Sequence, residues 1–177
     1  MLDLESDGSH PPRAGRPSPV ATVQERADPR PYEGTWRFTA PAVESSVPRL
    51  RRQVRDLIRR QAARVPEETL QNLLLILSEL ATNAVQHAAV LSPDMGVEVS
   101  LRAGRLRVAV EDGHPYRPKA LEPDAEQAEA TGGRGLLLVK MIAAEAGGVC
   151  DVEQTGAGGK VIWAALPVPV TSLPPPP

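Results

Sequence analysis

The sequence predicts an α/β fold of two layers, in which helices cover one face of a mainly antiparallel sheet. Residues 97–110 and 148–166 alternate apolar and polar side chains on both sides of short glycine-containing turns, a pattern typical of β-hairpins. Residues 45–64, 67–89 and 134–146 instead repeat apolar side chains with the period of an α-helix. The resulting order is strand, two helices, two strands, a long loop, helix and two strands.

The two ends of the chain differ from its middle. Residues 1–34 are rich in Pro, Arg and acidic residues and show no apolar period, so we expect a disordered leader. Residues 168–177 end in four prolines and are expected to form a disordered tail. The folded domain is therefore predicted to span residues 35–167, which is long enough for one hydrophobic core.

Composition excludes several classes of protein. A net charge of −2 argues against a general nucleic-acid or membrane binder. No apolar run is long enough to span a membrane or to serve as a signal peptide. A single cysteine excludes an internal disulfide framework and a cysteine-based zinc cluster. We therefore expect a cytoplasmic protein.

The first predicted elements are a short strand and an arginine-rich helix. Residues 35–40 alternate well enough for a strand, with Trp36 and Phe38 on the side opposite to Arg37. Ser45 or Ser46 can cap the following helix, in which seven arginines surround an apolar stripe. This basic face could bind an acidic partner or phosphate, or it could be a solvated face whose arginine stems cover apolar surface.

The central helix carries the first candidate site. Glu79, Asn83 and His87 are four residues apart, so they share one side of this helix, beside its apolar stripe. A carboxylate and a carboxamide on neighbouring turns could hold a divalent metal and a reacting oxygen, although a solvated polar edge has the same pattern. We assign His87, near the helix end, to capping or packing.

Two further segments could contact a ligand. Asp112-Gly113 ends the first hairpin, where a carboxylate could accept a hydrogen bond from an exocyclic amine such as that of adenine, or could merely form a turn. Residues 113–131 form a long loop without an apolar period, and loops of this length are usually lids, binding loops or disordered segments. The segment 131–136, TGGRGL, then opens a helix, where glycines let backbone N–H groups approach an anion. Arg134 could add a charged contact to phosphate, or it could merely be solvated.

Taken together, these segments resemble the GHKL (histidine-kinase-like) ATPase superfamily. The resemblance rests on Glu79-x-x-x-Asn83, Asp112-Gly113, the lid, and the run Gly132-Gly133-Arg134-Gly135-Leu136, in that order. Within the superfamily, SELATNAVQHA and GGRGLLLVKMIA look like the small anti-sigma factor serine/threonine kinases of bacterial partner-switching systems.

The resemblance implies a Bergerat-type ATP-binding fold with ATP held between helices and sheet. It implies that Glu79 accepts the proton of a Ser or Thr hydroxyl and that Asn83 contacts Mg²⁺. Asp112 would contact the adenine amine, and Gly132, Gly133 and Gly135 would line the phosphates. The other residues expected to bind the nucleotide are Gly113, Arg134 and Leu136. It also implies an anti-anti-sigma-like protein as substrate and favours a homodimer, and it leaves open whether a sigma factor is bound.

The sequence departs from the superfamily pattern twice. Asp112 is followed by Gly113, His114, Pro115 and Tyr116, so two expected glycines are missing and the lid hinge is stiffer. The final strand begins Lys160-Val161-Ile162 and offers no hydroxyl near the adenine. We therefore carry two hypotheses, an ATP-dependent serine/threonine kinase and a non-enzymatic or nucleotide-sensing module that binds a regulator through its arginine-rich helix.

Overall fold

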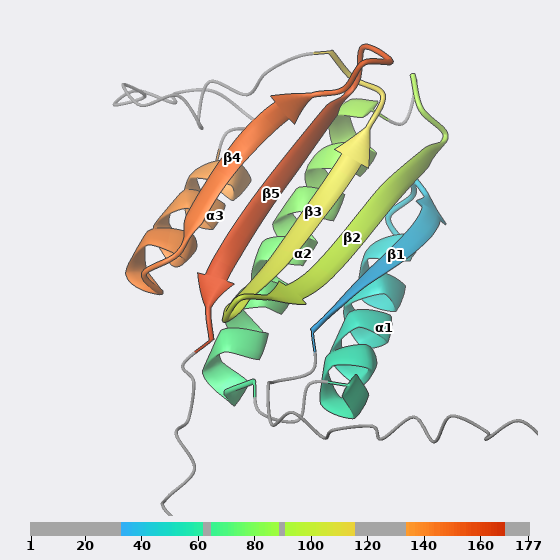
Figure 1. Cartoon of the computed structure of the whole chain (residues 1–177). Coiled ribbons are helices and arrows are strands. Elements are labelled where there is room, and N and C mark those ends of the chain that lie inside the picture. The colour runs from blue at the N-terminus through green and yellow to red at the C-terminus, as the bar shows by residue number, and fades with distance from the viewer. Residues whose placement is uncertain (1–32, 62–64, 89–90, 116–133, 169–177) are drawn as a thin grey trace, which may run out of the picture.

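The structure is a computed structural model that describes residues 33–61, 65–88, 91–115 and 134–168. Five antiparallel strands form one sheet in the order β1-β2-β3-β5-β4, and three helices cover one face of it (Figure 1). The elements in chain order are β1 (Gly34–Pro41), α1 (Ser46–Gln61), α2 (Glu67–Ala88), β2 (Asp94–Arg102), β3 (Arg105–Asp112), α3 (Arg134–Glu145), β4 (Val149–Gln154) and β5 (Lys160–Pro167). The predicted fold class and element order are thus confirmed.

The core lies between the helices and the sheet. Period-2 alternation places Val97 and Val99 of β2 and Val108 and Val110 of β3 beneath the helices, all at most 2% exposed. The central helix, α2, buries a continuous apolar stripe against them: Leu70, Leu73, Leu74, Ile76, Leu77, Leu80, Ala81 and Ala84. This stripe fixes the rotation of α2, and therefore which of its polar side chains face α3.

The predicted hairpin of β2 and β3 closes through a two-residue turn. Ala103 and Gly104 have φ values of 49° and 70°, the left-handed conformation that a type I′ turn needs. This register brings Asp112 to the end of β3, at the same end of the sheet as the start of β5. The turn thus determines where the candidate carboxylate lies.

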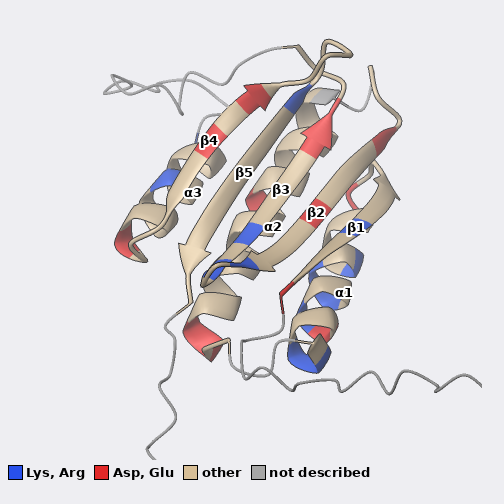
Figure 2. Cartoon of the chain, viewed as in Figure 1, with Lys and Arg blue, Asp and Glu red and all other residues tan. Residues whose placement is uncertain are grey.

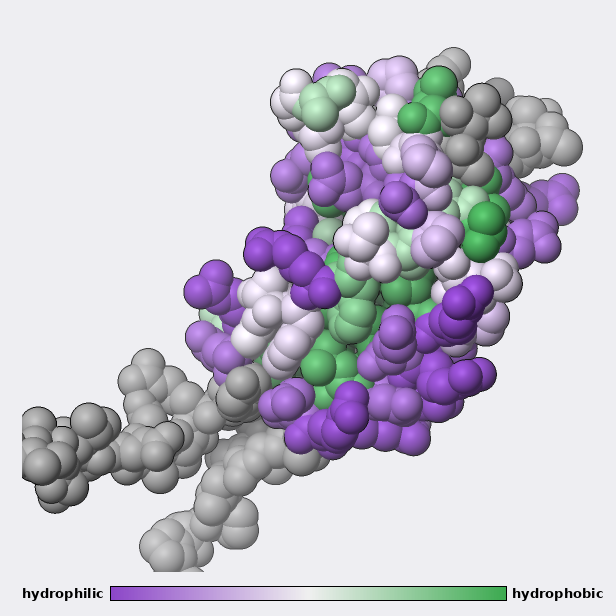
Figure 3. Space-filling model, turned by 90° about the vertical axis from the view of Figure 1, so that its right-hand side faces the viewer, coloured by the Kyte–Doolittle hydropathy of each residue, from purple (hydrophilic) through white to green (hydrophobic). Residues whose placement is uncertain are grey.

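The arginines of α1 contact their own chain in several places. Arg51 donates to the backbone oxygen of Leu74 at 2.9 Å and also to the hydroxyl of Ser78, which ties α1 to α2. Arg59 pairs with Glu67 at 3.1 Å. Seen from the side of β1 and α1, the surface has a hydrophobic area along its middle, and hydrophilic residues border this area (Figure 3). The predicted helix end near Arg64 lies outside the described residues, as do both chain ends and most of the lid. No helix in the described part is long and apolar enough to cross a membrane.

Candidate active site

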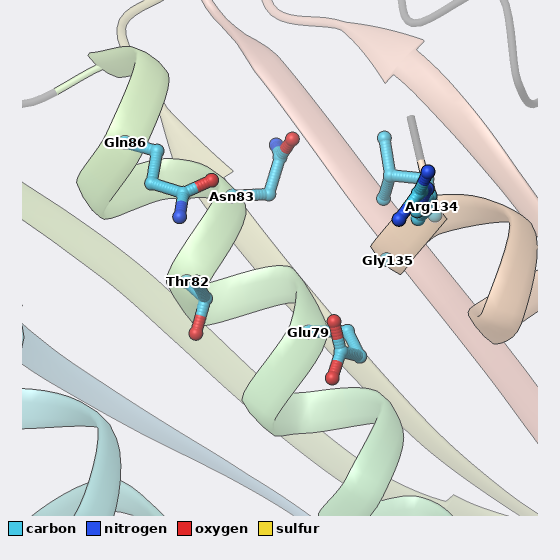
Figure 4. A pocket seen from close by; sticks show the side chains of 7 residues that line it. Glu79, Thr82, Asn83, Gln86, Arg134 and Gly135 are labelled. Atoms are coloured by element: carbon cyan, nitrogen blue, oxygen red, sulfur yellow. The ribbon is translucent and has the colours of Figure 1, made fainter. Parts of the chain in front are cut away.

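A cavity of about 350 Å³ lies between the second half of α2 and the start of α3 (Figure 4). Seven residues line it: Glu79, Thr82, Asn83, Gln86, Arg134, Gly135 and Leu136. Five of them are predicted site residues from two segments about fifty residues apart in sequence. The structure therefore brings the helical carboxylate and amide together with the glycine-rich helix start.

The start of α3 approaches Glu79 very closely. A Cβ atom added to Gly135 would lie 2.6 Å from Oε2 of Glu79, so a larger residue there would displace the carboxylate. The side chains of Glu79 and Asn83 point from α2 towards the first residues of α3 (Figure 4). Because the first turn of a helix has unpaired N–H groups and partial positive charge, this side of the cavity favours an anion.

Asn83 is the candidate metal ligand on the α2 side of the cavity. It is 8% exposed although it is polar, and its amide oxygen is a ligand type that Mg²⁺ accepts. Among the residues that the structure describes, no group of three His, Cys, Asp or Glu residues could hold a metal. A magnesium ion here would therefore rely on Asn83 together with oxygens of a bound molecule, as is common for Mg²⁺ on phosphates.

Two residues of the cavity, Thr82 and Gln86, were not predicted from the sequence. They lie three and seven positions after Glu79, so helical spacing places them on the same side of α2. A spacing of three residues would have found both, since Thr82 follows Glu79 by three and Gln86 follows Asn83 by three. His87, by contrast, is exposed in the last turn of α2 and does not line the cavity.

Asp112 is held by a buried ion pair. Nζ of Lys160 lies 2.8 Å from Oδ1 of Asp112, and both side chains are only 2% exposed. The same oxygen accepts a hydrogen bond from the backbone N–H of His114 at 2.9 Å. Figure 2 shows the basic start of β5 beside the acidic end of β3. Neither side chain lines the cavity between α2 and α3.

The ion pair follows from strand register, which the sequence analysis did not use. Asp112 and Lys160 are paired across β3 and β5, so their side chains point to the same, helix-covered face. Lys160 alternates with Ile162, Ala164 and Leu166, all buried. A lysine at a strand position that alternates with buried residues requires a partner, since lysine is almost never fully buried unless paired. That signal was available in the sequence.

Two glycines fix the backbone around this ion pair. A Cβ atom on Gly159 would clash with the backbone oxygen of Asp112 and would lie 3.1 Å from Cα of Gly113. A Cβ atom on Gly113 would lie 2.9 Å from Cβ of Ser92. The predicted contact residue Gly113 is therefore needed for close packing here. Gly132 and Gly133 lie outside the described residues.

The chain belongs to the histidine kinase-like ATPase domain family, whose model matches residues 40–166, well over half of the chain. This match and the observed antiparallel sheet with its helices define the same superfamily that the motifs indicated. A comparison with curated proteins gives no match.

Several solved histidine kinases are similar to the chain. The blue-light activated histidine kinase of Erythrobacter litoralis is 28% identical over 59% of this chain and 32% of its own, with a TM-score of 0.44. Full-length ShkA, solved with AMPPNP, is 24% identical over 73% of this chain and 31% of its own, with a TM-score of 0.44. The catalytic domain of ThkA is 18% identical over 76% of this chain and 96% of its own, with a TM-score of 0.46. The chain thus spans about a third of the length of the first two, and at these TM-scores the family match alone carries the assignment.

Proposed function

We propose that the chain is an ATP-dependent kinase that transfers phosphate to a serine or threonine of a partner protein of the anti-anti-sigma type. The observation that carries the proposal is the contact between Glu79 on α2 and Gly135 at the start of α3, on a cavity that Asn83 also lines. A carboxylate, an amide and a helix start are the groups that phosphoryl transfer needs for proton acceptance, metal contact and anion binding.

The residues present fit the phosphates of a nucleotide. We call the following four residues, which all line the cavity, the phosphate end of the site: Glu79, Asn83, Arg134 and Gly135. Because residue 135 is a glycine, the backbone of α3 lies too close to Glu79 for a side chain to fit between them. This backbone can therefore also approach a ligand that reaches the carboxylate. Bound Mg-ATP would supply the γ-phosphoryl group. Glu79 would accept the proton of the attacking hydroxyl, Asn83 would contact the metal, and Arg134 would offset phosphate charge.

The residues at the other end fit a nucleotide less well. We call Asp112 and Lys160 the base end of the site. The carboxylate that the superfamily pattern assigns to the adenine amine already binds the ammonium group of Lys160 at 2.8 Å. This observation favours the second candidate function, a module that binds a regulatory protein and does not depend on nucleotide.

A transfer assay separates the two functions. The native chain is incubated with γ-labelled ATP, Mg²⁺ and a candidate partner protein, and transfer to the partner is followed with and without the change Glu79→Ala. The kinase proposal predicts Ser/Thr-linked label with the native chain and a loss of about 10²-fold or more with Glu79→Ala, which removes the proton acceptor. Glu68→Ala, at an exposed carboxylate in the first turn of α2, is the matched control. Transfer that survives Glu79→Ala would refute the role of Glu79, and a native chain with no affinity for Mg-ATP would leave the second function.

A further inference from the structure

Lys160 stands out because it is a fully buried lysine in a position that the proposed mechanism does not use. It is 1% exposed and is among the largest fully buried side chains of the described part. Its ammonium group donates to Oδ1 of Asp112 at 2.8 Å and to the backbone oxygen of His114 at 3.5 Å. The chain itself therefore provides Asp112 with a charged hydrogen-bond donor.

This donor replaces what a nucleotide base would otherwise provide. A buried carboxylate without a partner is costly, so it has a strong tendency to accept a hydrogen bond from whatever donor enters the site. An exocyclic amine of a base is such a donor. Here the carboxylate is already neutralised by Lys160, and its Oδ1 also accepts the N–H of His114. An incoming amine thus gains less than it would at an unpaired carboxylate.

Because the surrounding backbone is closely packed, Asp112 is released from the ion pair by rotation of the Lys160 side chain. Gly159 is packed against the backbone of Asp112, and Gly113 is packed against Ser92, so neither strand end can move apart without losing these contacts. The lysine stem, in contrast, is unbranched and flexible. Lys160 and the N–H of His114 both occupy Oδ1 of Asp112, so a base amine can take that oxygen only in the fraction of molecules with Lys160 turned away, and the apparent affinity for binding there is reduced by that fraction.

We infer that Lys160 competes with the nucleotide base for Asp112, and so keeps the affinity of this chain for ATP low and its preference for adenine weak. The inference rests on the proposed binding of ATP at this site. It assigns to Lys160 a role in base selectivity that is separate from the phosphate end, whose cavity Lys160 does not line.

The test compares two nucleotides on several variants by isothermal titration calorimetry. ATP is compared with purine riboside triphosphate, which lacks the exocyclic amine, on the native chain, Lys160→Thr and Asp112→Asn/Lys160→Thr. Lys140→Thr, at the other lysine of the described residues, is the matched control. We expect Lys160→Thr to bind ATP about tenfold more tightly and to prefer it to the amine-free nucleotide about tenfold or more, the effect of one hydrogen bond to a charged group. The double variant should lose this gain, and Lys140→Thr should behave as the native chain.

The native chain gives an independent result if Lys160→Thr does not fold. We expect the native chain to prefer ATP to the amine-free nucleotide by less than about threefold, because Asp112 is already paired. A native preference above about tenfold would overturn the inference, as would unchanged or weaker ATP binding by folded Lys160→Thr. Absence of binding of both nucleotides to every folded variant would instead refute the proposed function, and with it this inference.

Discussion

The phosphate end and the base end of the site satisfy their polar groups in opposite ways. At the phosphate end, Glu79 and Asn83 face a cavity of about 350 Å³, bordered by the backbone of Gly135. At the base end, the side chains of Asp112 and Lys160 are each 2% exposed and form an ion pair with each other. One end is therefore arranged to receive an external ligand, and the other is already complete within the chain.

The largest expected difference between the two ends concerns stability. Lys160→Met removes one partner of a buried ion pair and leaves Asp112 as an uncompensated charge, which typically costs about 3–5 kcal/mol. Glu79→Gln changes a half-buried group on an open cavity and should alter the free energy of unfolding by less than about 1 kcal/mol. Urea unfolding of both variants measures these two free energies of unfolding. Similar losses of stability in the two variants would contradict the difference between the two ends.

A second prediction concerns Gly159 at the base end. Gly159→Ala places a methyl group against the backbone oxygen of Asp112, where rigid backbone must move. We expect a loss of about 1–3 kcal/mol in the free energy of unfolding, as is usual for overpacking. Gly156→Ala is the matched control, since a Cβ atom there meets nothing within 4 Å. Equal effects of the two changes would show that the backbone at Asp112 is not closely packed.

A third prediction concerns Gly135 at the phosphate end. The added methyl of Gly135→Ala meets only the far end of the Glu79 side chain, which can rotate away, so stability should fall by less than about 1 kcal/mol. Phosphoryl transfer should fall about tenfold or more, because the carboxylate is displaced from its position. Transfer by the native chain and this variant is compared at saturating ATP. Full activity would show that the contact with Gly135 does not position Glu79.

The smallest effect is expected far from both ends, at Cys150 of β4. Burial raises the pKa of the Cys150 thiol above its ordinary value of 9.0; the nearby Lys140 ammonium opposes this shift, and the Asp151 carboxylate adds to it to a smaller extent. Since the thiolate is the reactive form, alkylation by iodoacetamide should be slower than for a free cysteine at pH 8 and should still be increasing above pH 9. Because burial disfavours the thiolate in the folded state, this group leaves the free energy of unfolding unchanged well below pH 9 and lowers it as the pH rises above that value. A rate that levels off below pH 9 would contradict the assignment.

Much of the fold could be predicted from local sequence patterns, and so could the placement of Glu79 and Asn83 on one side of a helix. The apolar stripe of α2 and the hairpin of β2 and β3 are local signals, and the spacing of Glu79 and Asn83 placed both on one side of a helix. Proximity of Gly135 to Glu79 came from the order of superfamily motifs, because no local pattern relates residues so far apart. The ion pair of Asp112 with Lys160 depends on the register of β3 with β5, across 48 positions. It was missed because Lys160 was considered for its missing hydroxyl and not for its buried phase in the strand.

The proposed function requires that the phosphate end binds Mg-nucleotide, and one titration measures this binding. Mg-ATP binding to the native chain, to Asn83→Ala and to the matched control Asn72→Ala is measured by calorimetry, with and without EDTA. We predict that Asn83→Ala and EDTA each weaken binding about tenfold or more, while Asn72→Ala leaves it within about twofold, because only Asn83 lines the cavity. Equal affinity of the native chain and Asn83→Ala, unchanged by EDTA, would contradict the account.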